Sequence, residues 1–236
     1  NYATAIIMDY QLHINANKKL PYTIKTETRM LYNPQQKGAY NFVPGVMAMV
    51  LLLVCTMMTA ITIVKEKELG TMEIMLVSPM KPIKIVIAKA VPYLLLSIVN
   101  ILSILLLSVF VLDVPINGSL PLLIAESILF ILVSLSLGLL ISAGSATQQA
   151  AMFISLIGMF LPTIMFSGFM FPVENMPKPL QVISNIVPAK WFFIIVKSVM
   201  IKGTGIATVW KETLVLIGML IFFLTMAIKK FKIRLA

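Results

Sequence analysis

The chain has 236 residues, of which 59% are hydrophobic and only 12% charged, and its formal net charge is +10. Soluble domains contain roughly 45–50% apolar and about 25% charged residues, so this composition excludes an ordinary soluble protein and indicates an integral membrane protein. The positive charges gather where apolar runs end, which is typical of membrane topology and argues against a nucleic-acid partner. The single Cys55 and single His13 predict neither a disulfide framework nor a zinc site.

Residues 1–40 differ from the rest of the chain because they are polar and mixed in composition. Residues 1–17 fit a short helix, and residues 22–30 (YTIKTETRM) alternate as a half-exposed strand does. We interpret the segment as the C-terminal part of a small α/β domain outside the membrane. Since the chain starts at Asn1 with neither Met nor a signal peptide, we expect the earlier part of that domain to lie upstream in a longer protein.

Five apolar runs are long enough to cross a membrane, because a spanning helix needs about 20 residues. They cover residues 43–64, 90–112, 120–141, 152–171 and 206–228, within a membrane domain of residues 41–236. The fourth run contains Pro162, which predicts a kink. The predicted fold class is therefore an all-α integral membrane bundle with five transmembrane helices.

The Lys and Arg residues predict the orientation of these spans. Basic residues are dense in residues 65–89 and in the C-terminal tail, and residues 113–119 contain none. We therefore expect the 65–89 segment and the C-terminus in the cytoplasm and residues 1–40 outside. The same assignment places residues 172–205 outside, although that segment contains four lysines, at Lys178, Lys190, Lys197 and Lys202.

Residues 172–205 contain two apolar pieces, 178–187 and 189–201, that are each too short to span and are separated by Pro188. A cluster of aromatic residues follows Lys190, which is typical of an interfacial anchor. We interpret the pieces as helices that lie in, or dip into, the outer leaflet. The alternative is an ordinary external loop.

A charged segment, residues 65–82 (KEKELGTMEIMLVSPMKP), separates the first two spans. On a helical wheel its apolar side chains share one arc and its charged ones the opposite arc, so it predicts an amphipathic helix along the cytoplasmic surface. Its charged side would be available to a soluble partner. Pro79 and Pro82 would end this helix.

No motif in the chain indicates catalysis. The sequence contains no GxxxxGK[ST] phosphate-binding loop, a single His excludes a Ser/His/Asp set, and the carboxylates are scattered. We therefore expect a protein that is not an enzyme and has no catalytic residue and no metal site.

Polar residues inside the spans are the other functional candidates. Glu126 lies about two turns inside the outer end of its span, where a carboxylate either faces a cavity or partner residue, or instead reaches the headgroups or carries a proton. Asn100 lies mid-span, in position for an interhelical hydrogen bond. Gln148 and Gln149 open the fourth span, either as a polar helix start or in a coupling role. The spacings of Gly138 with Ser142 and of Gly158 with Pro162 would allow close helix packing or bending.

The order of these elements resembles the permease subunits of type-2 ATP-binding-cassette (ABC) exporters, a group that includes bacterial multidrug and polysaccharide exporters. The resemblance covers nearly the whole chain. It rests on LYNP at 31–34, VPG at 43–45, VKEKELGTMEIMLVSPMKP at 64–82, GLLIS at 138–142, TQQAAM at 147–152, SGFMFPVENMP at 167–177 and the region of Trp210. The charged loop with its Pro-stopped helix, followed by FPxxNMP, is the most specific combination.

The resemblance implies a six-helix permease in the bacterial plasma (inner) membrane, whose first helix would lie upstream of Asn1. It would work as a dimer, with an identical or different second permease, and with ATPase domains that use ATP and Mg, while this chain would bind no cofactor. Residues 65–82 would be the coupling helix seated in the ATPase, and residues 172–205 the external re-entrant helices. The ATPase contacts would be Glu66, Lys67, Glu68, Gly70, Thr71 and Glu73. Candidates for the translocation path or gate would be Glu126, Asn100, Gln148, Gln149 and Asn175.

The expected function is outward transport of a drug-like, lipid-linked or other amphipathic substrate by alternating access coupled to ATP hydrolysis. One alternative is an ion-gradient-driven transporter, which would need ionisable residues near the bilayer centre; only Glu126 is available. The other is a non-transporting membrane component of a cell-envelope complex.

Overall fold

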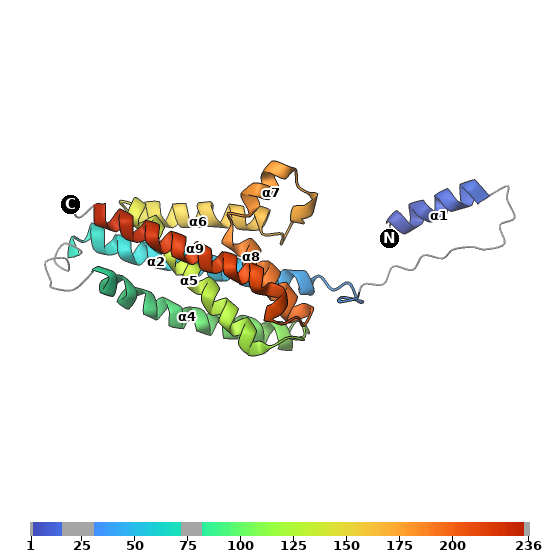
Figure 1. Ribbon diagram of the computed structural model, residues 1–236, viewed down its shortest axis with the longest axis horizontal. Helices are drawn as coiled ribbons and strands as arrows, with labels where there is room; N and C mark the ends of the chain where they lie inside the picture. The colour runs from blue at the N-terminus through green and yellow to red at the C-terminus, as the bar shows by residue number, and fades with distance from the viewer. Residues whose placement is uncertain (1, 16–30, 72–81, 234–236) are drawn as a thin grey trace. The chain divides into compact units, whose positions relative to one another are not determined.

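The computed structural model describes residues 2–15, 31–71 and 82–233, and every regular element within these ranges is helical (Figure 1). Two compact units are present, residues 1–36 and 37–236. The elements in chain order are α1 (Tyr2–Asn15), α2 (Ala39–Glu68), α4 (Pro82–Phe110), α5 (Leu120–Gly144), α6 (Gln148–Phe166), the 3₁₀ turn η1 (Val173–Asn175), α7 (Lys178–Ser184), α8 (Pro188–Val196), the π-helical turn η2 (Lys197–Ile201) and α9 (Ile206–Ile233).

The first unit contains the short helix that the sequence predicts near the N-terminus, here α1. A turn follows at Asn33 and Pro34, where the Gln36 N–H donates to the Asn33 carbonyl at 3.0 Å. The strand predicted at residues 22–30 lies outside the described residues. The small α/β domain therefore stays a prediction.

Among the described residues of the second unit, five helices are long and apolar enough to cross a membrane, which confirms the predicted all-α bundle with five spans. They are Ala39–Glu68, Val91–Phe110, Leu120–Gly144, Gln148–Phe166 and Ile206–Lys230. The fourth begins earlier than its apolar run because Thr147 caps it, accepting a hydrogen bond from the Ala150 N–H at 3.2 Å. It also ends earlier, where Gly168 adopts a φ of +84°.

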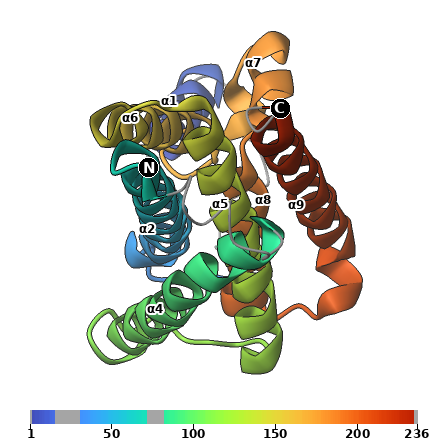
Figure 2. The ribbon, with the colours of Figure 1, turned by 90° about the vertical axis from the view of Figure 1, so that its left-hand side faces the viewer.

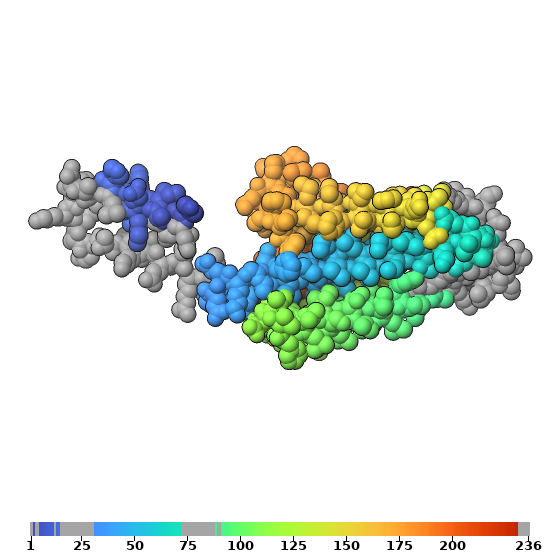
Figure 3. All heavy atoms as spheres, turned by 180° about the vertical axis from the view of Figure 1, so that it is seen from behind, coloured from blue at the N-terminus to red at the C-terminus, as the bar shows by residue number. Residues whose placement is uncertain are grey.

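Helices α5 and α8 occupy the middle of the second unit, and each packs against both α2 and α9 (Figure 2). Seen from behind, α2 lies between α4 and α6 and packs against both (Figure 3). The end of α2, the start of α4, the α5–α6 turn and the end of α9 share one end of the bundle (Figure 1). We call this the coupling end. The loop at residues 113–119 and the turns around α7 and η2 lie at the opposite end.

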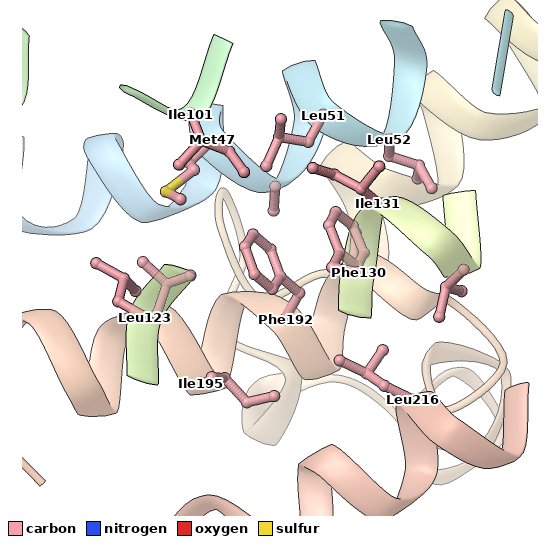
Figure 4. Close-up of a cluster of buried hydrophobic side chains, with 14 of the residues drawn as sticks. Met47, Leu51, Leu52, Ile101, Leu123, Phe130, Ile131, Phe192, Ile195 and Leu216 are labelled. Carbon is pink, nitrogen blue, oxygen red and sulfur yellow. The ribbon is translucent and has the colours of Figure 1, made fainter. Parts of the chain in front are cut away.

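The core joins these helices through large apolar side chains. The rings of Phe130 on α5 and Phe192 on α8 stack with their centroids 4.1 Å apart and their planes 1° from parallel. Leu51 of α2 and Leu216 of α9 are fully buried in the same cluster (Figure 4). Since lipid chains are themselves apolar, close packing of such groups is what holds membrane helices together.

The outer segment keeps the expected break near Pro188, but its second piece is enclosed by protein instead of lying at an interface. α7 and the α8–η2 pair are bent by 83° relative to each other, as in a re-entrant turn or a broken span. α7 is largely exposed, whereas α8 is buried in the bundle, with Phe192 and Ile195 fully enclosed. The reason is that α8 is apolar on nearly every face, so that it packs best within the protein.

Helices α2 and α5 approach closely at Gly138. A Cβ atom built on this glycine would lie 2.6 Å from the carbonyl oxygen of Thr56 and 2.8 Å from Cβ of Thr59. The close packing suggested by the glycine spacing is thus confirmed at this position. At Gly158 the same construction meets no described atom within 4 Å, so that glycine has no packing role among the described residues.

All four serines of α5 are buried, and each donates its hydroxyl to a carbonyl three or four residues earlier in the same helix. The acceptors are the carbonyls of Leu123, Phe130, Val133 and Leu139, at 2.6–2.9 Å. Such bonds satisfy a hydroxyl without a partner on another helix. α5 therefore carries several polar groups through the core and satisfies them internally.

Candidate functional site

The expected coupling segment begins as a continuation of α2. Residues 65–68 form the last turn of that helix, and the chain leaves it where the Leu69 N–H donates to the Lys65 carbonyl at 3.0 Å and Gly70 adopts a φ of +69°. A left-handed glycine is the usual end of a helix. The prediction of a separate surface helix starting at residue 65 is therefore wrong at its beginning, because Lys and Glu favour continued helix.

The rest of that segment, residues 72–81 with Glu73 among them, lies outside the described residues. The backbone of Thr71, the last described residue before it, is again helical. The Thr71 hydroxyl donates to the carboxylate of Glu66 and so holds the turn across the glycine. Pro82, which was expected to end the surface helix, is the first residue of α4.

Two of the sequence candidates, 80 residues apart, meet at the coupling end. The Gln148 backbone N–H donates to Oε1 of Glu68 at 3.0 Å, and the Gln148 side-chain amide donates to Oε2. Gln148 is the first residue of α6, where backbone N–H groups have no partner within the helix and a carboxylate is favoured. Glu68 therefore caps α6 from the end of α2. The side chain of Gln149 is exposed and forms no hydrogen bond with another described residue.

A second bond fastens the same turn of α2 to α5. Nζ of Lys67 donates to the carbonyl oxygen of Ser142, which lies in the last turn of α5. A cation is favoured at a helix C-terminus, where carbonyl groups lack partners. Lys67 and Glu68, which are consecutive in α2, are thus hydrogen-bonded to the end of α5 and to the start of α6, respectively. This acceptor could not be predicted from the sequence, because every residue type supplies a backbone carbonyl.

Glu126 is the buried carboxyl group of the opposite half of the bundle, with 3% of its surface exposed. Its Oε1 lies 2.7 Å from the hydroxyl of Thr213 on α9, and its Oε2 has no partner among the described residues. The Thr213 hydroxyl also lies 3.0 Å from the Val209 carbonyl. The Thr213 hydroxyl is the donor in both contacts, so its one proton is shared between Oε1 of Glu126 and the helix carbonyl.

The structure therefore gives Glu126 a partner residue on another helix, one of the alternatives that the sequence left open. The carboxyl does not reach the headgroup layer through an exposed path, since it is enclosed between α5 and α9. Sequence reasoning missed Thr213, although a hydroxyl beside Glu212 near the start of the last span was the available signal.

Asn100 and Asn175 have simpler surroundings. Asn100 is half-buried on α4 and makes no side-chain hydrogen bond to any described residue, so the expected interhelical bond is absent there. The polar contacts between α2 and α4 are made instead by Cys55 with Ser97, at 2.9 Å, and by Thr62 with Tyr93. Asn175 is exposed in η1, where its backbone N–H donates to the Pro172 carbonyl at 3.1 Å.

Comparison with known proteins gives the family. Residues 2–229 match the family described as ABC-2 family transporter protein. The chain belongs to the ABC-2 transporter family. With its five candidate spans it is a multi-pass membrane permease of the ABC-2 type, and the family resemblance seen in the sequence is confirmed.

Several curated relatives of this ABC-2 chain have names. It is 32% identical over 212 residues to the probable multidrug ABC transporter permeases YbhS and YbhR of Escherichia coli (strain K12), covering 90% of this chain and 56% and 57% of theirs. It is 30% identical over 238 residues to ABC transporter G family member 20 of Dictyostelium discoideum, covering 97% of this chain and 32% of that protein. The chain thus spans little more than half of the two bacterial relatives. No solved structure matches it.

Proposed function

We propose that this chain is the transmembrane permease part of an ATP-driven exporter, and that force from a cytoplasmic ATPase enters it at the coupling end. The observation that carries the proposal is the pair of bonds made by consecutive residues of α2, Lys67 to the end of α5 and Glu68 to the start of α6. Membership of the ABC-2 family supports an ATPase partner, supplied as a separate subunit or a fused domain.

The mechanism follows from these bonds. A partner that holds residues 65–82 and moves when it binds ATP and Mg pulls on the last turn of α2. Because that turn is bonded to α5 and α6, the three helix ends move together, and the bundle repacks between inward-open and outward-open states. The exposed residues available to the partner on this turn are Lys65, Glu68, Leu69 and Gly70. The chain itself takes no part in ATP chemistry.

The setting of the permease is part of the same proposal. The coupling end, with the C-terminus, faces the cytoplasm of a bacterium, and residues 1–40 lie outside the plasma membrane. Large apolar side chains on α4, α6 and α9 are exposed in the single chain, which supports their being covered by lipid and by a second permease; examples are Leu102, Ile157 and Phe222. The cargo is drug-like, lipid-linked or otherwise amphipathic, a proposal supported by the multidrug names of the bacterial relatives.

A charge reversal at the coupling segment tests the proposal. In the complete transporter, Glu66→Lys combined with Glu73→Lys is expected to leave membrane insertion intact and to leave ATP hydrolysis running without export. Asp9→Lys, in α1, is the control for charge reversal as such, because Asp9 is exposed outside the second unit. Unchanged export by the double variant, or export in ATP-free vesicles driven by an ion gradient, would overturn the proposal. The second result would instead favour a secondary transporter.

A further inference from the structure

A cavity of about 490 Å³ opens at the end of the bundle opposite the coupling end. It lies beside η1 and α8, and its wall includes Asn41 from α2, Phe169 and Phe193. Three of the four lysines of residues 172–205 line it, namely Lys190, Lys197 and Lys202. Among the residues that the structure describes, Glu174 is the only acidic one in its lining.

Lys197 is held in position by neutral groups. Its Nζ donates to Oδ1 of Asn41 at 2.9 Å and lies 5.5 Å from the centre of the Phe193 ring. The Asn41 side-chain amide in turn donates to the Phe169 carbonyl at 3.0 Å, which fixes the acceptor. The half-buried ammonium group is therefore positioned by α2 and α8, and the groups that contact it there are neutral.

Lys190 is positioned in the same way. Its Nζ donates to the Ser184 hydroxyl at 2.9 Å and to Oδ1 of Asn185 at 2.6 Å, and it lies over the Trp191 ring. Within residues 31–71 and 82–233, no carboxylate forms an ion pair with any of the three cavity lysines. With one carboxylate against three ammonium groups, the lining carries a surplus of positive charge. Half-buried charges without counter-charges are costly, and a bound anion relieves that cost.

We propose that this cavity binds a phosphate or carboxylate group, held by charge-assisted hydrogen bonds from Lys190 and Lys197. The surrounding surface favours a group carried by an amphipathic molecule such as an anionic lipid. Met170, which lines the cavity, is 61% exposed, and the next residue along the chain, Phe171, is exposed as well, so the two offer an apolar surface for an acyl chain. The site goes beyond the proposed export and does not depend on it. Only its assignment to the outer leaflet rests on the proposed topology.

Binding to the purified full-length protein in neutral detergent tests the proposal. The probes are dihexanoyl phosphatidic acid, its phosphatidylcholine counterpart and inorganic phosphate, titrated without ATP. The Lys190→Gln/Lys197→Gln variant is expected to bind phosphatidic acid about tenfold more weakly than the wild type, because Gln keeps an N–H donor and removes the charge. Lys178→Gln is the matched control, since Lys178 is exposed in the same segment outside the cavity lining, and it is expected to bind like the wild type.

Glu174→Gln gives a result that misfolding cannot imitate. Removing the single acidic group of the lining is expected to strengthen binding of phosphatidic acid severalfold. Tighter binding of phosphatidic acid than of inorganic phosphate identifies a lipid headgroup as the source of the anion, and equal binding identifies a free anion. Absence of anion binding, equal binding by the double-lysine variant and the wild type, or an equal loss in Lys178→Gln would overturn the site. Since no step uses ATP, these outcomes are independent of the export test.

Discussion

Gln148 donates both its backbone N–H and its side-chain amide to the carboxylate of Glu68, and so fastens the first turn of α6 to the last turn of α2. Glu68→Ala removes both bonds. In the complete transporter we expect ATP hydrolysis to continue while export falls by roughly tenfold, equivalent to about 1.4 kcal/mol of lost coupling. The measurement is the ratio of substrate exported to ATP hydrolysed in vesicles. Gln149→Ala, at an exposed neighbour, is expected to keep the wild-type ratio, and an equal fall in both variants would contradict the role of this bond.

A methyl group added at Gly138 should weaken the contact between α2 and α5. Gly138→Ala places a Cβ within 3 Å of the Thr56 carbonyl, so the helices must separate, and overpacking of this kind costs about 1–3 kcal/mol. We expect a fall of several degrees in the unfolding temperature in detergent. Gly158→Ala makes the same chemical change in α6, where the Cβ meets no described atom within 4 Å, and its expected effect is neutral or slightly stabilising. Equal melting of the two variants would disprove the close approach.

The hydrogen bond between Thr213 and Glu126 should contribute to the stability of the folded protein. Thr213→Val keeps the shape of the side chain but leaves Oε1 of Glu126 without its hydrogen bond, which costs about 1–3 kcal/mol for a buried polar group. We expect a lower unfolding temperature in detergent. Thr213→Ser retains the hydroxyl and should lose much less stability. If the Ser variant melts as early as the Val variant, the methyl group and not the hydrogen bond is what matters.

Cysteine labelling tests the proposed orientation. The only native cysteine, Cys55, is buried, so a membrane-impermeant maleimide should report on introduced sites alone. In intact cells we expect Lys178→Cys to react and Lys65→Cys to react only after the membrane is opened; both native side chains are exposed. Reaction of both sites in intact cells, or of Lys65→Cys alone, would reverse or abolish the proposed topology.

The five spans could be predicted because each depends on a property that sequence displays directly, an uninterrupted apolar run of sufficient length. Their ends could not be placed as well. The first span runs on through Glu68 because charged helix-forming residues continue a helix beyond the apolar region, and Gly70 is what ends it. The burial of α8 was missed for a related reason. An apolar segment too short to span fits an interface as well as a core, and only its partners, Phe130 among them, decide between the two.

At the candidate sites, residue types were easier to predict than their pairings. Glu68 and Gln148 were both singled out, yet nothing in a single sequence states that they meet, since 80 residues separate them. Glu126 is a recognisable candidate because an ionisable group inside a membrane span costs free energy. Thr213 could not be predicted as its partner, because hydroxyl side chains are common in helices. The lysines of residues 172–205 looked like an exception to the orientation rule. Three of them share one cavity, a fact that only their positions in space reveal.

The internally bonded serines of α5 have a consequence for motion. Three hydrogen bonds tie α5 to neighbouring spans: Glu126 with Thr213, the Ser134 carbonyl with Thr56 and the Ser142 carbonyl with Lys67. Within the described helices, no other side chain or carbonyl of α5 makes such a bond. A rotation of α5 about its own axis would carry its hydroxyl bonds along unbroken. The most enclosed of the five candidate spans is thus also one that can turn against its surroundings at a low cost in polar contacts.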